Sequence, residues 1–332
     1  MTRRSMAVHQ VSRPHGQPTA ENFAFVEDAF PKPVPGMALV ENVYLSVDPY
    51  MRECMDALWD LHAPLEGRSI GRVVDSQDSH LAVGDLVFHR NGWRTHALVR
   101  AADVRVLPQV SGIPTSAYLS ILGGTGLTAY VALTRIARLQ AGEAVFISAA
   151  AGGVGNAAGQ IARLLGAGRV VGSTGSLAKA THLTANLGFD AAFDYHQGSV
   201  SELLAQAAPE GIDVYLDNVG GDHLEAAIRV LREHGRIAWC GAVAQYNSTE
   251  LPAAPRNLYG VVEKSLRLEG FLVRNYRHLQ GDLEELLVPH IQSGRIVVDQ
   301  TVVAGFDQVV NAFLGMLRGE NRGKMLVQVS EH

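Results

Sequence analysis

Apolar and polar residues alternate differently along three parts of the chain. In the first part, short apolar segments are separated by glycine, proline and other turn-forming residues, a pattern typical of β-strands. The strand-like segments are GMALVENVYLSV (residues 36–47), GRVVD (71–75) and VGDLVFHRNGWRTHALVR (83–100), the last comprising a strand, a turn and a second strand. The pattern therefore predicts a β domain at the start of the chain.

From about Leu122 onward, helical segments alternate with apolar strands. In GLTAYVALTRIARL (126–139), apolar residues recur at the spacing that places them on one face of a helix. Six strand candidates follow, at Ala144–Ser148, Arg169–Ser173, Ala191–Tyr195, Ile212–Asp217, Arg236–Gly241 and Arg267–Val273. Strands that alternate with crossover helices predict a doubly wound parallel sheet, and hence an α/β fold.

The last part of the chain differs again. The segment FDQVVNAFLGMLRG (306–319) has the apolar stripe of an amphipathic helix, and KMLVQV (324–329) follows it as one more strand. Because no further crossover follows that strand, we expect the tail to return to the N-terminal β domain.

Composition narrows the class of protein. A chain of 332 residues exceeds the usual size of one hydrophobic core, so two domains are expected. The net charge of −5 and the lack of a basic run argue against nucleic-acid binding. No apolar run is long enough to cross a membrane, and the N-terminal residues do not form a signal peptide. We therefore expect a cytoplasmic protein that binds neither membrane nor nucleic acid.

The pattern of metal-binding side chains predicts no metal site. The two cysteines, Cys54 and Cys240, form no CxxC pair, and none of the 13 histidines belongs to an HExxH motif.

The most informative passage is ISAAAGGVGNAAGQIARLLG (147–166). A predicted strand ends there, and a glycine-rich turn opens an amphipathic helix. Free backbone N–H groups and the helix dipole favour a pyrophosphate at such a place. Gly152 allows close approach to the phosphate and Gly155 lets the helix pack on the strand. We expect the loop residues Gly152, Gly153, Val154 and Gly155 to bind a dinucleotide.

The end of the second strand indicates which dinucleotide. An acidic residue that binds the ribose 2′-hydroxyl of NAD belongs about 20 residues past the glycine fingerprint. The segment there, GSTGSLAK (172–179), has no acid. It offers hydroxyls at Ser173 and Ser176 and a cation at Lys179, one of only four lysines in the chain. A 2′-phosphate suits these groups, so we predict NADP(H); the alternative is that Lys179 is merely a solvated residue of the next helix.

Several motifs occur in order along nearly the whole chain. They are YLSVDPYMR (44–52), GLTAYVAL (126–133), SAAAGGVG (148–155), LDNVGG (216–221), CGAVAQYN (240–247), RLEGFLV (267–273) and GENRGKMLV (319–327). Together they resemble the zinc-independent medium-chain dehydrogenases/reductases of the leukotriene B4 12-hydroxydehydrogenase, prostaglandin reductase and curcumin reductase type.

That resemblance implies a fold and an activity. It implies a GroES-like β domain of residues 1–122, completed by 301–332, and a Rossmann domain of residues 123–300. It also implies a homodimer that uses NADPH to reduce the carbon–carbon double bond of α,β-unsaturated aldehydes and ketones. By position in the family pattern, the residues expected on the cofactor, besides the phosphate loop and Lys179, are Tyr195, Asn218, Cys240, Gly241, Ala242, Tyr246, Phe271, Leu272, Val273 and Asn321.

Two departures from the family pattern are visible. Where the zinc-bearing branch has GHE, this chain has GRS (Gly67–Ser69), in agreement with the absence of a metal. Where bacterial relatives have a tyrosine after P-x-N, this chain has Leu258, and Tyr259 is displaced by one position. Other relatives place a tyrosine where this chain has Glu263.

No complete set of catalytic side chains is evident. The sequence has neither the Tyr-x-x-x-Lys pair of short-chain reductases nor an ordered Ser-His-Asp set. Reduction of an enone tolerates this, because the cofactor carries the hydride and the protein needs only to orient the enone and stabilise an enolate oxygen. Three tyrosines are candidates for that donor: Tyr50, Tyr246 and Tyr259. For each of them the alternative is a packing or loop residue.

The sequence therefore predicts an NADPH-dependent enone reductase. The nearest alternative is a quinone reductase that uses the same hydride donor. A different class of protein, one that binds NADPH without turnover, also fits the motifs.

Overall fold

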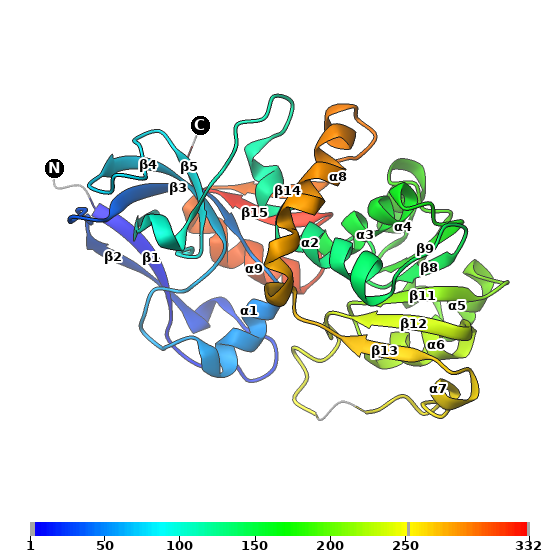
Figure 1. Cartoon of the computed structure of the whole chain (residues 1–332). Coiled ribbons are helices and arrows are strands. Elements are labelled where there is room, and N and C mark those ends of the chain that lie inside the picture. Colours follow the sequence, from blue (N-terminus) through cyan, green and yellow to red (C-terminus); the bar gives the residue numbers. More distant parts are fainter. Residues whose placement is uncertain (1–3, 251–252, 331–332) are drawn as a thin grey trace. The chain divides into compact units, whose positions relative to one another are not determined.

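Two sheets and one hairpin organise the computed structural model, which describes residues 4–250 and 253–330 (Figure 1). By their contacts these residues divide into two compact units. The first contains the described residues up to Leu119, Gln300–Asn321 and those from Met325 onward; the second contains Ser120–Asp299 and Arg322–Lys324.

The first unit is mainly β. Its large sheet has the strand order β14-β15-β3-β4-β5-β7, with β6 also paired to β3, and β1 and β2 form a separate antiparallel hairpin. The bounds are β1 Arg4–Gln10, β2 Phe23–Ala29, β3 Ala38–Ser46, β4 Ser69–Ser76, β5 Leu86–His89, β6 His96–Val99, β7 Arg105–Val106, β14 Gln300–Ala304 and β15 Lys324–Gln328. The C-terminal strand β15 thus lies antiparallel to β3, far from it in sequence (Figure 1).

The core of this unit is aromatic. Phe313 on α9 (Val309–Leu317) meets Trp93 edge-on, with the ring centres 5.6 Å apart. Phe23 stacks on the same indole at 5.8 Å. A short helix, α1 (Tyr50–Glu53), continues into a π-helical turn, Cys54–Leu58, that packs on this core through Met51 and Met55. The core therefore joins segments from both ends of the chain.

The second unit is a doubly wound parallel sheet, which confirms the predicted α/β fold. Its strand order is β10-β9-β8-β11-β12-β13. The bounds are β8 Ala144–Ile147, β9 Arg169–Thr174, β10 Ala191–Asp194, β11 Ile212–Asp217, β12 Leu231–Trp239 and β13 Arg267–Gly270. The chain runs outward from β8 to β10 and then returns to β11 beside β8, so the order reverses between β8 and β11.

Helices cover both faces of this sheet (Figure 1). Helices α5 and α6 share one apolar core with Phe146, Phe193 and Tyr215 of the strands. The helices are α2 Gly124–Val131, α3 Gly153–Leu164, α4 Leu177–Asn186, α5 Val200–Ala207, α6 Gly221–Val230, α7 Gly260–Glu263 and α8 Gln280–Gln292. Among the described residues, no helix has the length and apolar character needed to cross a membrane.

Two elements differ from the sequence-based prediction. Strand β12 begins at Leu231, five residues before the predicted Arg236, because Leu231 pairs with Ile212 of β11 ahead of a shift in register. The last strand was expected to reach Val273, but β13 ends at Gly270, and a 3-10 segment follows from Val273. The residues after Gly270 are as apolar as the strand but partly exposed, so apolar character alone did not show where β13 ends.

Candidate cofactor site at the carboxyl ends of the parallel strands

The predicted cofactor residues of the second unit all follow carboxyl ends of parallel strands, or lie at those ends. They come after β8 (Gly152–Gly155), at and after β9 (Ser173, Lys179), after β10 (Tyr195), after β11 (Asn218), after β12 (Cys240–Ala242, Tyr246) and after β13 (Phe271–Val273). Parallel strands present their carboxyl ends at one edge, and doubly wound sheets bind ligands there, where the strand order reverses. The fold thus collects residues spread over more than 100 positions at one edge.

The glycine-rich loop between β8 and α3 has the geometry of a phosphate cradle. Gly152 is the N-cap of α3, and the N–H groups of the helix's first turn have no partner within the helix. A Cβ on Gly155 would lie 2.4 Å from the carbonyl oxygen of Ala149, closer than any side chain tolerates. Ala149 itself adopts a left-handed conformation, with φ of 48°. The loop can therefore fold back against the helix only with glycine at position 155.

A segment near the C-terminus lies against this loop. The N–H of Gly323 donates to the carbonyl oxygen of Ala151 at 2.8 Å. Lys324 is 4% exposed, and its Cδ lies 3.2 Å from where a Cβ of Gly153 would be. The GENRGKMLV motif predicts a cofactor role for Asn321 but none for Lys324. Its rarity as one of four lysines was the available signal.

The end of β9 offers hydroxyls and a cation without an acid. Ser176 caps α4, since its Oγ accepts from the N–H of Lys179 at 3.3 Å. Lys179 is partly buried in the first turn of α4, and burial lowers the pKa of its ammonium. Ser173 is fully buried on β9, and its Oγ has no hydrogen-bond partner in the described structure. Ser176 and Lys179 are thus better exposed to a ligand than Ser173.

On the adenosine side, Tyr195 follows β10. Its ring is 38% exposed and lies against His196, with ring centres 4.2 Å apart, and edge-on to His223. The Cβ position of Gly175 is 3.4 Å from its hydroxyl oxygen, so Tyr195 borders the turn that leads to Lys179.

On the other side of β8, hydrogen bonds join three loops. The amide of Asn218 donates from Nδ2 to the carbonyl oxygen of Ser148 at 2.7 Å. Its Oδ1 accepts from the Cys240 thiol at 3.1 Å. Burial raises the pKa of Cys240 above its usual range, so the side chain remains a thiol. The N–H of Ala242 donates to the hydroxyl oxygen of Tyr246 at 3.4 Å.

The residues after β13 are less enclosed. The N–H of Phe271 donates to the carbonyl oxygen of Trp239 at 3.3 Å, and its ring meets Tyr276 edge-on. Leu272 is 54% exposed. Asn321 belongs to the first unit by its contacts.

The three candidate tyrosines differ in environment. Tyr50 begins α1 in the first unit; its hydroxyl is buried and has no hydrogen-bond partner among the described residues. The Arg68 guanidinium lies over its ring, 5.2 Å from the centre. Burial, and then the charge of Asp48, hold the pKa of Tyr50 well above its usual range. Tyr246 lies at the cofactor edge, whereas Tyr259 is 70% exposed before α7.

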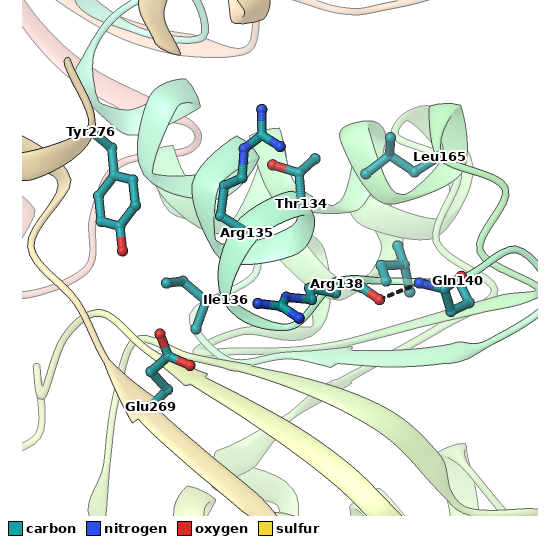
Figure 2. A pocket seen from close by; sticks show the side chains of 9 residues that line it. Thr134, Arg135, Ile136, Arg138, Gln140, Leu165, Glu269 and Tyr276 are labelled. Carbon is teal, nitrogen blue, oxygen red and sulfur yellow. Dashed lines mark hydrogen bonds between the residues drawn. The ribbon is translucent and has the colours of Figure 1, made fainter. Parts of the chain in front are cut away.

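A cavity of about 700 Å³ lies elsewhere on the second unit (Figure 2). In Figure 2, Tyr276 and Glu269 lie to the left of Arg135 and Arg138, and Leu165 lies to their right. It includes Gln140, which precedes β8, and Leu165, which follows α3, so it lies toward the amino ends of the strands. None of the predicted cofactor or catalytic residues lines it. Arg135 is already paired there with Asp282, at 3.3 Å.

Over residues 4–250 and 253–330, no group of three or more His, Cys, Asp or Glu side chains could hold a metal ion. At the GRS position, Ser69 is buried and its hydroxyl donates to the carbonyl oxygen of Gly67.

Comparison with known proteins gives matches over the whole chain. A family model described as the N-terminal domain of oxidoreductases matches residues 7–107, and one described as zinc-binding dehydrogenase matches residues 153–293. The NADPH-dependent curcumin reductase of Escherichia coli is 36% identical over 330 residues, which is 96% of this chain and 95% of that protein. The NADP⁺-dependent 2-alkenal reductase of Nicotiana tabacum is 37% identical over 300 residues, 88% and 87% of the two chains. The crystal structure of CurA from Vibrio vulnificus in complex with NADPH matches with a TM-score of 0.92 at 33% identity, covering 98% of this chain and 100% of that one.

The steric constraint at Gly155 can be tested by one methyl group. We expect Gly155→Ala to raise the dissociation constant for NADPH about tenfold or more, because the added Cβ must push the loop away from α3. The matched control is Gly281→Ala in α8, where a Cβ would meet nothing within 4 Å. Titration of intrinsic fluorescence with NADPH measures both. Equal affinities for the two variants would contradict the steric argument.

Proposed function

The chain belongs to the zinc-independent medium-chain dehydrogenases/reductases, and we propose that it catalyses the NADPH-dependent reduction of the carbon–carbon double bond of α,β-unsaturated aldehydes and ketones. The observation that carries this proposal is the acid-free end of β9, where Ser176 and Lys179 follow the strand that pairs with β8, which leads into the glycine loop of α3. Together with relatives named as curcumin and 2-alkenal reductases, this supports an NADP(H) enzyme that reduces conjugated carbonyls.

The residues at this edge fit the parts of NADP(H). The first turn of α3 would bind the pyrophosphate through backbone N–H groups, and Lys179 with Ser176 would bind the 2′-phosphate. Tyr195 would lie along the adenosine, and Cys240–Ala242 and Phe271–Val273 along the nicotinamide half. The family pattern suggests an adenosine and ribose position for Asn218 as well, but its hydrogen bond with the Cys240 thiol favours the nicotinamide side. When bound, the reduced nicotinamide supplies a hydride.

We propose that Tyr50 donates the hydrogen bond to the carbonyl oxygen of the substrate. A phenol keeps its proton at neutral pH and can donate a hydrogen bond, and burial raises the pKa of Tyr50 further above neutrality. A buried hydroxyl without a partner costs about 1–3 kcal/mol, which a carbonyl oxygen of the substrate would offset. As charge develops on that oxygen, the same donor would stabilise it. Tyr246, bonded to the Ala242 N–H, suits a role in holding the cofactor loop.

The activity and the cofactor preference can be tested together. We expect consumption of NADPH, but little of NADH, with a medium-chain 2-alkenal and an aryl enone, and products that have lost the carbon–carbon double bond. Lys179→Ala should raise the NADPH dissociation constant roughly 10- to 100-fold and leave NADH binding unchanged, because only the 2′-phosphate contacts the ammonium.

Lys32→Gln, a change of an exposed lysine in the first unit, is the control. Turnover of a simple quinone alone would favour a quinone reductase. NADPH binding without turnover of any acceptor would favour a non-catalytic binding protein.

The role of Tyr50 predicts a loss in kcat rather than in cofactor affinity. We expect Tyr50→Phe to lower kcat about a hundredfold with an unchanged dissociation constant for NADPH, as for the loss of an oxyanion donor. Steady-state kinetics and fluorescence titration measure the two quantities. Tyr130→Phe in α2 is the control. A kcat within twofold of the wild type would assign Tyr50 to packing instead.

We further propose that the protein is a cytoplasmic homodimer. Strand β13 is an edge of the parallel sheet, and exposed apolar side chains, Leu272 and Val262, lie near it. Unpaired edges are commonly covered by a second copy. The two cysteines are free, as in most proteins of a reducing compartment.

The dimer proposal makes a separate prediction. Light scattering should give twice the chain mass, and Val262→Glu, at an exposed residue outside the proposed cofactor site, should shift the protein toward monomer, since a charge would be buried in the proposed interface. Val83→Glu, at an equally exposed valine of the first unit, should change nothing. A monomeric wild type would remove the proposal.

A further inference from the structure

A buried carboxylate, Asp217, lies behind the cofactor edge. It ends β11, is 0% exposed, and was assigned no role by the sequence motifs. Its Oδ1 accepts hydrogen bonds from the Tyr215 hydroxyl at 2.7 Å and from the backbone N–H groups of Val219 and Gly220, each at 2.8 Å. A longer contact, 3.4 Å, comes from the Ser148 hydroxyl.

The main-chain carbonyl of Asp217 also binds the loop that follows β12. The carbonyl oxygen of Asp217 accepts from the N–H of Cys240 at 3.0 Å and of Gly241 at 3.3 Å. The Ser148 hydroxyl, in turn, accepts from the N–H of Asn218 at 3.0 Å. Asp217 therefore connects the loops that follow β8, β11 and β12.

The turn that the carboxylate holds is not one that the chain adopts readily. Gly220 and Gly221 have φ of 74° and 51°, in the left-handed region. Two N–H groups at this turn point at Oδ1 just before α6 begins at Gly221. A carboxylate at a helix N-terminus is favoured by the dipole, and hydrogen bonds to a charged acceptor are stronger than those to a neutral one. The acid thus fixes a turn that glycine alone would leave flexible.

The cost of this arrangement suggests that it serves the site. Oδ2 of Asp217 is buried without a hydrogen-bond partner among the described residues, and burial raises the pKa of the carboxyl against the pull of those N–H donors. Buried, incompletely paired carboxylates are expensive for stability alone.

We propose that Asp217 is a positioning residue for the nicotinamide half of NADP(H), which it does not itself touch. Its carboxylate holds the turn at Val219 and Gly220, directly after Asn218, whereas its main-chain carbonyl binds Cys240 and Gly241. The carboxylate acts on the nicotinamide side through that turn, and the inference rests on the cofactor and activity proposed above. The adenosine-side residues Ser176, Lys179 and Tyr195 follow β9 and β10, beyond β8, and the hydrogen bonds of the Asp217 carboxylate within the described chain go to other residues. Loss of the carboxylate should therefore affect one half of the cofactor and spare the other.

Two ligands separate these halves. Adenosine 2′,5′-bisphosphate carries the adenosine with its 2′- and 5′-phosphates but no nicotinamide, whereas NADPH carries the nicotinamide as well. For Asp217→Asn we expect the dissociation constant of NADPH to rise about tenfold, and that of the bisphosphate to stay within about twofold, by calorimetry. The rate of hydride transfer in a single turnover should fall by a similar factor.

The same strand provides a matched control. Asp213, at its other end, also binds a backbone N–H, that of Ala144 at 2.8 Å, and the Arg232 guanidinium at 2.7 Å. Asp213→Asn makes the same chemical change at the amino end of β11, away from the predicted cofactor residues. It should alter the dissociation constant of neither NADPH nor the bisphosphate. Tyr215→Phe, which keeps the acid and removes one donor, should give a smaller change in the same direction as Asp217→Asn and covers the case in which Asp217→Asn does not fold.

Each outcome is decisive. Equal losses for both ligands would make Asp217 a general structural residue, and no loss for either would remove the proposal. The dissociation constants of NADPH and of the bisphosphate are measured without an enone, so neither depends on whether the protein reduces one. A wild type that binds NADPH but reduces no enone would therefore contradict the proposed function and leave the role of Asp217 open to the same comparison.

Discussion

The cofactor edge depends on one close approach, between the first turn of α3 and the loop that leaves β8. A side chain at Gly155 would lie 2.4 Å from the Ala149 carbonyl oxygen, so the helix can start this close to the strand only because that residue has none. The approach aims backbone N–H groups at the point where the strand order reverses. The segment around Gly323 then lies against the loop through its bond to Ala151. Main-chain atoms consequently hold the loop, through the approach of Gly155 to Ala149 and through the bond from Gly323.

The two sides of the cofactor site, at the carboxyl ends of the parallel strands, differ in charge. On the β9 side, the chain provides a cation and a helix-capping hydroxyl where an NAD enzyme would have an acid. On the β11 side, an acid is present, but it is buried and bonded to the protein's own N–H groups. The carboxylate thus cannot repel phosphate from the exposed surface, and it organises the loops instead. The same chemical group would oppose NADP(H) binding if it were moved to the end of β9.

Several features were readable from the sequence because they depend on neighbouring residues. The strand–glycine–helix order around Gly152, the missing acid before Lys179 and the alternation of strands and helices are all local patterns. The limits of β12 and β13 were not, since pairing with neighbouring strands sets where a strand starts and ends. Ser173 illustrates a similar limit: its place at the end of a strand suggested a ligand, but it is buried. Lys324 was not predicted because its neighbour Gly153 is distant in sequence, and the role of Asp217 was not predicted because its bonding partners Ser148, Cys240 and Gly241 are also distant.

By itself, the sequence determined the fold class, the family and the choice of NADP(H), because each rests on residue type and spacing within short segments. Only the tertiary structure decided which polar groups are shared between segments: Asp217 with the loops after β8 and β12, and Gly323 with the phosphate loop. It also showed that the Tyr50 hydroxyl has no partner within the described chain, whereas Tyr259 is exposed. The physical reason is that burial and hydrogen bonding are properties of the space around an atom, and residues far apart along the chain fill that space.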